Sequence, residues 1–249
     1  MRRIHRVPLP ARAHGYLETR RLATAGPIAV DRAWKRARRT QALGEVVRTL
    51  RSMAGPLERC MYCVDSHGSD IEHFWPKASY AERAFEWANL LLCCTECGRL
   101  KGDRFPLLPG GQAALVDPSA EDPWDHLDFD PDTGNLTARY DAASAAPSAR
   151  GAATVKLLQL DRREAMTEGC RRTYRRLADR VRQALAASEV IDAEQLASDL
   201  LRLDDHGLLG WCFGPIGSTL EPFLELRRRD PEAARLLRDS IAGAEKAPA

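Results

Sequence analysis

The chain has 249 residues, of which 44% are hydrophobic, so it can bury a substantial core and is not a disordered tail. The net charge of +2 neither favours nor excludes a nucleic-acid partner. No apolar run approaches the ~20 residues that cross a bilayer, and the basic N-terminus lacks the apolar segment of a secretory signal. We therefore expect a cytoplasmic protein with no membrane association.

Charge is distributed unevenly along the chain. Residues 1–60 contain 14 Lys and Arg against 4 Asp and Glu, whereas residues 117–132 contain seven acidic residues and no basic one. A basic N-terminal region can attract a phosphate backbone, but a solvated helix face has the same composition. Charge alone leaves both interpretations open.

The predicted elements begin with a helix from about Pro27 to Met53, which ends at Gly55-Pro56. A compact cysteine-containing segment follows, and residues 127–140 then predict a β-hairpin around the turn DTGN. Helical spacing returns from Thr154, and two Asp residues that precede helical patterns predict further helix starts, Asp192 and Asp230. The sequence therefore predicts an α+β fold in three parts: a basic helical region (1–56), the cysteine segment (57–108), and a hairpin followed by helices (109–249).

Four of the seven cysteines form two CxxC pairs, Cys60/Cys63 and Cys94/Cys97, with 30 residues between the pairs. Disulfides are rare in the cytoplasm, and two such pairs suit one tetrahedral Zn²⁺ held by four thiolates. The alternative is a set of buried free cysteines, but two correctly spaced pairs rarely arise by chance. The spacing selects Cys94 rather than its neighbour Cys93, which we expect to pack in the preceding apolar run.

The segment between the cysteine pairs contains the run DIEHFWPK at residues 70–77. Glu72 offers oxygen ligands to a hard cation such as Mg²⁺, and His73 titrates near neutral pH and can serve as a general base. Neighbouring side chains on a strand point to opposite faces, so these two share a site only if the strand ends or bends there. Phe74-Trp75-Pro76 favours such a break. The amide of Asn89 can fix a loop or orient the imidazole.

The order of these motifs, from CxxC through carboxylate–His and Asn to LLLCxxC and Lys101-Gly102-Asp103, resembles the HNH endonucleases. The core of that superfamily is a ββα-metal fold, and its zinc-stapled branch carries CxxC pairs in a similar arrangement. The resemblance implies a nuclease with His73 as the general base, Asn89 at the middle motif position, and Glu72 as ligand of a catalytic Mg²⁺ or Mn²⁺. It also implies that the four CxxC cysteines hold a structural Zn²⁺.

A looser resemblance covers most of the chain. The basic helical lead-in, DIEHFWPK, KGDRFP, FDPDTGNL and TVKLLQLDRREAM together are similar to a bacterial HNH subfamily. Its members occur with ATPases in anti-phage systems such as Septu, and with some retrons. This resemblance implies a DNA substrate and an ATPase subunit as partner.

The chain departs from the superfamily at the third motif position, where Gly98 replaces His or Asn. Because glycine has no side chain to bind a metal, the resemblance implies a site held by Glu72, waters and phosphate oxygens. Asp70 and Asp103 are the candidate substitute ligands.

Two other functions remain open. Gly98 also fits a decayed nuclease that serves as a zinc-stapled module for binding nucleic acid or a partner, and nothing in the sequence distinguishes DNA from RNA. Two lysines, Lys77 and Lys101, lie where cations can meet phosphates, although surface lysines commonly have no such role.

Overall fold

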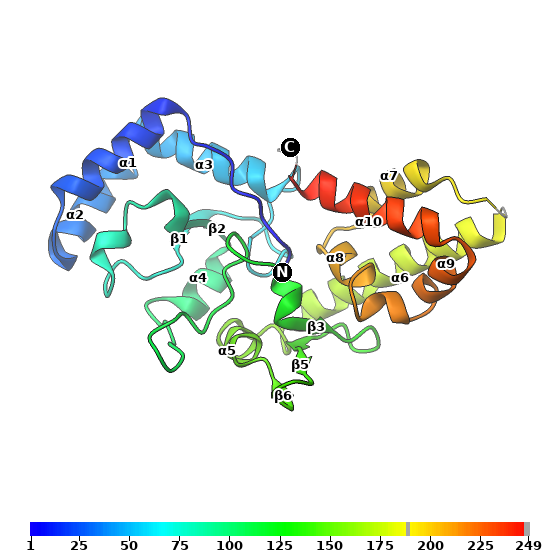
Figure 1. Ribbon diagram of the computed structural model, residues 1–249. Helices are drawn as coiled ribbons and strands as arrows, with labels where there is room; N and C mark the ends of the chain where they lie inside the picture. Colours follow the sequence, from blue (N-terminus) through cyan, green and yellow to red (C-terminus); the bar gives the residue numbers. More distant parts are fainter. Residues whose placement is uncertain (188–189, 247–249) are drawn as a thin grey trace.

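The computed structural model describes residues 1–187 and 190–246. The N-terminal helices α1–α3 and the small β1–β2 sheet lie on one side of the molecule, and helices α6–α10 form a bundle on the other (Figure 1). Strands β3–β6 and helix α5 lie between these two groups. One hydrophobic core extends through both groups, with Val46, Leu92 and Leu177 among its fully buried members.

Three helices form the N-terminal region: α1 (Ala11–Ala23), α2 (Pro27–Ala37) and α3 (Gln41–Ala54). The single helix predicted from Pro27 to Met53 is therefore wrong, because the chain breaks between α2 and α3. Thr40 makes the break: its hydroxyl donates to the Ala37 carbonyl oxygen at 2.7 Å and accepts from the Leu43 amide at 3.4 Å. It thus ends one helix and caps the next.

The cysteine segment has a ββα order. Antiparallel strands β1 (Asp70–His73) and β2 (Leu90–Cys93) pair with Glu72 opposite Leu91 and His73 opposite Leu90. Helix α4 (Thr95–Lys101) follows directly. All four β2 residues are buried, whereas β1 is partly exposed. The inner strand thus anchors the outer strand, which carries the candidate site.

The predicted β-hairpin is confirmed as strands β3 (Leu127–Phe129) and β4 (Leu136–Ala138). Its turn requires Gly134, which has φ +79° and lies where a Cβ would be 2.1 Å from the Thr167 carbonyl oxygen. A second short pair follows, β5 (Tyr140–Asp141) with β6 (Ala146–Pro147).

The remaining helices are α5 (Ala149–Leu158), α6 (Glu164–Ala187), α7 (Ala193–Leu203), α8 (Leu209–Cys212), α9 (Phe223–Arg229) and α10 (Pro231–Lys246). Two predicted helix starts are confirmed, because Asp192 accepts the Gln195 amide and Asp230 accepts the Ala233 amide, each at 2.9 Å. Four 3₁₀ turns complete the described elements: Ala81–Arg83, Trp87–Asn89, Pro123–Asp125 and Gly217–Thr219. Across residues 1–187 and 190–246, no helix has the length and apolar character needed to cross a membrane.

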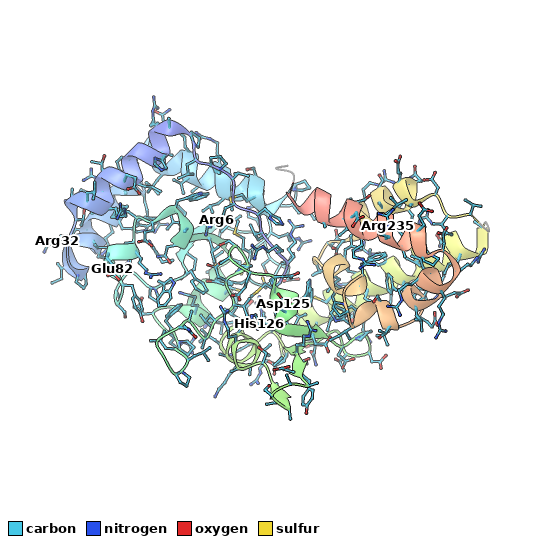
Figure 2. The ribbon with its side chains drawn as sticks, viewed as in Figure 1. Arg6, Arg32, Glu82, Asp125, His126 and Arg235 are labelled. Carbon is cyan, nitrogen blue, oxygen red and sulfur yellow. The ribbon has the colours of Figure 1, made fainter. Side chains whose placement is uncertain are left out.

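Arg6 in the N-terminal segment forms hydrogen bonds with the cysteine segment. The Arg6 guanidinium donates to three carbonyl oxygens around the start of β2, those of Trp87, Ala88 and Leu90, at 2.7–2.9 Å. Figure 2 shows Arg6 lying beside this part of the chain. These bonds hold the entry to β2, so the cysteine segment does not pack as an isolated unit.

Candidate metal centre and catalytic site

The four CxxC cysteines come together in the structure. Their Sγ atoms all lie within 4.8 Å of one another, and those of Cys63 and Cys94 are 3.9 Å apart. Four thiolates around Zn²⁺, each with a Zn–S bond of about 2.3 Å, are separated by about 3.8 Å. The cluster therefore has the size and ligand chemistry for one zinc ion. Cys93 stays outside it, since its thiol donates to the Cys94 carbonyl oxygen at 3.3 Å.

An arginine from a distant part of the chain contacts this cluster. Arg163, between α5 and α6, donates to Cys97 Sγ at 3.2 Å and to the Glu96 carboxylate at 2.5 Å. A guanidinium beside a thiolate compensates part of the negative charge of a four-cysteine site. Arg163 thus links the metal centre to the C-terminal helices.

Arg163→Met is expected to lower zinc affinity about 10- to 100-fold, because the thiolate cluster loses its charged hydrogen-bond donor. Competition with a chromophoric chelator measures the affinity. The matched control is Arg162→Met, since Arg162 is 64% exposed and pairs only with neighbouring Asp161. Equal zinc affinity in both variants would contradict the assigned role.

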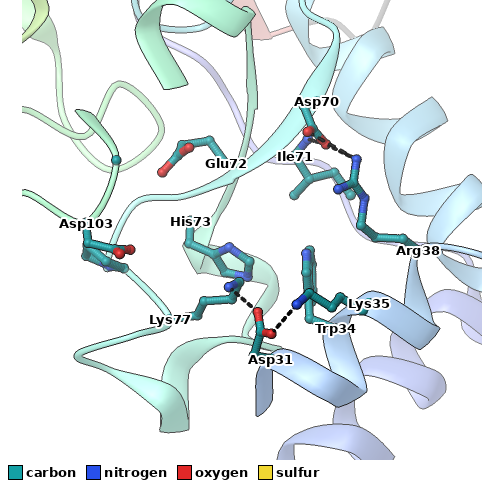
Figure 3. A pocket seen from close by; sticks show the side chains of 12 residues that line it. Asp31, Trp34, Lys35, Arg38, Asp70, Ile71, Glu72, His73, Lys77 and Asp103 are labelled. Atoms are coloured by element: carbon teal, nitrogen blue, oxygen red, sulfur yellow. Dashed lines mark hydrogen bonds and ion pairs between the residues drawn. The ribbon is translucent and has the colours of Figure 1, made fainter. Parts of the chain in front are cut away.

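A cavity of 270 Å³ lies at the end of β1 (Figure 3). Both Glu72 and His73 line it, together with Asp31 and Trp34 of α2 and with Arg38, which follows that helix. The strand ends at His73, which is the break that the sequence predicted after this residue. Because the strand ends there, two neighbouring side chains reach one cavity.

His73 is held in one orientation and buried. Its imidazole packs against the Trp34 ring, with ring centroids 4.3 Å apart, and Nε2 lies 3.0 Å from the Ala84 carbonyl oxygen. A carbonyl only accepts hydrogen bonds, so Nε2 carries the proton and Nδ1 of the neutral ring keeps its lone pair. Burial lowers the pKa of His73 to about 4. The ring is thus neutral near pH 7, in the protonation state of a general base.

His73 is expected to make stability depend on pH. Its pKa falls from 6.5 to about 4 on burial, so the unfolded chain takes up this proton first as the pH falls. Above pH 6.5 the buried His73 costs no stability. The free energy of unfolding decreases as the pH falls towards 4, by up to about 3 kcal/mol. Urea unfolding of the wild type and His73→Gln at about pH 7 and about pH 4.5 measures this loss. An equal loss in both proteins would contradict it.

Asn89 fixes the loop that follows β1, as the sequence suggested. Its Oδ1 accepts the Trp75 amide at 2.7 Å, and its Nδ2 donates to the carbonyl oxygens of Trp75 and Arg83 at 3.0 and 2.9 Å. The next carbonyl, that of Ala84, is the one that orients His73. Asn89 therefore holds the loop that carries the carbonyl oxygen bonded to the His73 imidazole.

Glu72 is paired with a lysine inside the protein. The Lys101 ammonium donates to Glu72 Oε1 and to the His73 carbonyl oxygen, both at 2.8 Å. The Lys101 side chain has no exposed surface, so the prediction that it meets phosphates is wrong. Burial raises the pKa of Glu72, and the Lys101 charge opposes that effect. Lys101 holds the candidate catalytic carboxylate in place.

Lys77, by contrast, lines the cavity and connects it to α2 through an ion pair with Asp31. The Asp31 carboxylate accepts from Lys35 at 2.8 Å and from Lys77 at 2.9 Å (Figure 3). These two hydrogen bonds lower the pKa of Asp31 to about 2. Helix α2 thus places Asp31 and Lys35 at the cavity.

The candidate ligands of a catalytic cation are not equivalent. Asp70 and Asp103 both line the same cavity as Glu72, but Asp70 is engaged by Arg38 at 3.1 Å. A Cβ on Gly98 would lie 3.7 Å from Glu72 Oε2, so the third motif position faces this carboxylate. Among the described residues, three or more ligand atoms converge only at the cysteines.

Two contacts of this site were missed in the sequence. Trp34 packs on His73 although the two residues are far apart along the chain, and Lys101 was interpreted as a surface cation. The second gave no local signal, because lysine is almost always exposed and its buried partner Glu72 lies on another element.

Comparison with known proteins gives two partial similarities. No protein-family model matches the chain. The chain is 30% identical over 141 residues to the Septu protein PtuB of Bacillus mycoides (strain KBAB4), a match that covers 44% of this chain and 45% of that protein. It is 28% identical over 74 residues to the Septu protein PtuB of Bacillus thuringiensis, covering 28% and 27% of the two chains. The chain thus matches less than half the length of these relatives. The two similarities support the Septu-type resemblance of the sequence motifs.

Proposed function

We propose that the protein is an HNH-type endonuclease that hydrolyses phosphodiester bonds in DNA. The observation that carries this proposal is that Glu72 and His73 line one cavity, with His73 oriented by the Ala84 carbonyl oxygen so that Nδ1 is free to accept a proton. The four-cysteine cluster beside them fits a structural Zn²⁺.

Each residue has a separate task in the proposed reaction. His73 Nδ1 takes the proton of a water that attacks the phosphorus in line with the departing 3′ oxygen. Glu72 and Asp103 would hold Mg²⁺ or Mn²⁺, which would supply charge stabilisation at the phosphate. Lys101 orients Glu72, and Asn89 orients His73 through the loop. Lys77 on the rim offers a cation to the neighbouring phosphates.

The similarity to the Septu protein PtuB supports a role in anti-phage defence. We propose an ATPase subunit as the partner, because the resemblance of the sequence motifs implies one. Co-expression with a candidate ATPase subunit tests the partnership. We expect the two proteins to co-purify, and separate elution at micromolar concentration would contradict the partnership.

Cleavage of labelled duplex DNA, single-stranded DNA and RNA of the same sequence tests the proposed substrate. With Mg²⁺ or Mn²⁺ present, we expect duplex DNA to be cut fastest. Faster cutting of RNA would identify the protein as an RNase.

A decayed binding module is the second candidate function, and one observation favours it. Gly98 leaves no side chain opposite Glu72 Oε2, while Lys101 already occupies Glu72 Oε1. This candidate predicts binding to nucleic acid or to a partner protein, without cleavage under any divalent ion. Gly98→Asn separates the two, because an added ligand would raise cation affinity only where the rest of the site is intact.

A further inference from the structure

A second and larger cavity, of 650 Å³, lies away from the candidate catalytic site. Its walls come from the N-terminal segment, the end of α3, the chain just before and after the first CxxC pair, and the end of α7. Its volume falls in the range of small-molecule sites. Apolar side chains form much of its lining, with Met53, Ala54 and Val64 buried and Leu57 half exposed.

Most of the charged residues that line this cavity are already paired. Arg2 donates to the Ala54 carbonyl oxygen at 2.6 Å, and Arg202 pairs with Asp199 of its own helix. Both lining carboxylates are also engaged. Asp204 accepts the amides of Leu208 and Leu209, and Asp205 pairs with Arg176.

Two arginines of the lining remain without a partner. Within residues 1–187 and 190–246, the guanidinium groups of Arg3 and Arg59 have no hydrogen bond or ion pair. Both residues are partly buried, where an uncompensated charge is costly. Two lining guanidinium groups are thus left without a bonding partner, beside an apolar lining.

We propose that this cavity binds a small organic anion, with its anionic head on Arg3 and Arg59 and its apolar body against Met53, Ala54 and Val64. Paired guanidinium groups suit phosphate, sulfonate or carboxylate. Two classes of molecule have this form. In a nucleotide the phosphate is the anionic head and the base is the less polar body, and in a fatty acid the carboxylate is the head and the acyl chain is the body. Arg59 and Val64 each adjoin a cysteine of the cluster, and the end of α7 lines the same cavity. A bound anion would therefore contact both the cysteine segment and α7.

Fluorescence titration with anilinonaphthalene sulfonate, which joins an anionic head to an apolar body, tests the site in the zinc-loaded, full-length protein. We expect saturable binding of one equivalent. Arg3→Gln and Arg59→Gln should each weaken it about tenfold, the effect of losing one charged hydrogen bond. The matched control is Arg202→Gln, on the same rim but already paired, which should bind like the wild type. Zinc content and melting temperature verify that each variant is folded.

Competition against the bound probe identifies the source of the ligand. Displacement by a deoxynucleoside monophosphate assigns the site to nucleotides, and displacement by decanoate assigns it to acyl anions. Either result supports the site, provided that inorganic phosphate competes more weakly. Three results would overturn it: wild-type probe affinity in both Arg3→Gln and Arg59→Gln, an equal loss in Arg202→Gln, or no displacement by either anion at millimolar concentration.

Discussion

Loss of the metal from the four-cysteine cluster is expected to unfold the segment from residue 57 to residue 108. The four thiols converge within 4.8 Å, and β1, β2 and α4 are short, so a metal ion there would tie the two ends of this segment together. Structural zinc in small domains contributes about 10–16 kcal/mol, comparable to the entire stability of a typical domain. Chelation should therefore abolish the protection of β1 and β2 amides from hydrogen exchange.

Two substitutions give this prediction a matched control. Cys63→Ser removes a ligand and should leave the protein with less than one zinc equivalent and with exchanging β1 and β2 amides. Cys93→Ser changes a similarly buried neighbour that lies outside the four-cysteine group and donates to the Cys94 carbonyl oxygen, a bond that serine can also make. It should retain one zinc and its exchange protection. Loss of zinc in Cys93→Ser, or full zinc in Cys63→Ser, would contradict the assigned ligand set.

Lys101→Met is expected to destabilise the protein by about 3 kcal/mol, because it leaves Glu72 buried without its counter-charge. The lysine side chain is fully buried and that of Glu72 is only 18% exposed, so solvent screens the pair weakly. Equilibrium urea unfolding measures the change. Arg99→Met, on the exposed face of the same helix, should change stability by less than about 0.5 kcal/mol.

A double variant distinguishes two causes of the stability loss in Lys101→Met: the broken ion pair with Glu72 and the lost packing of the lysine side chain. If the penalty arises from the unpaired Glu72 carboxylate, Lys101→Met with Glu72→Gln should be more stable than Lys101→Met alone. Additive losses in the double variant would show that Lys101 acts only through packing and its bond to the His73 carbonyl oxygen.

Local motifs in the sequence predicted the parts of the site that depend on short-range geometry. The CxxC spacing identified the four clustered cysteines, the DTGN turn identified the hairpin, and Phe74-Trp75-Pro76 indicated the strand end that brings Glu72 and His73 to one cavity. Each of these features depends on residues that are close together in the chain.

Contacts between distant segments could not be predicted in this way. Arg163 contacts Cys97 across 66 positions, and Trp34 reaches His73 from a separate helix. Helix α1 was missed because it buries only Ala13 and Leu17, which leaves a weak apolar pattern. The interior position of Lys101 was missed because lysine is almost always exposed, and only its tertiary partner accounts for its burial.

The most direct test of the proposed nuclease is cleavage of supercoiled plasmid DNA with Mg²⁺ or Mn²⁺, by the wild type beside His73→Ala. Zinc content and melting temperature are measured on both proteins, so that loss of the fold is not mistaken for loss of the base. We predict cutting by the wild type and a rate at least about 100-fold lower in the zinc-loaded variant, the usual contribution of a general base. Cleavage by His73→Ala at the wild-type rate would contradict the proposed mechanism.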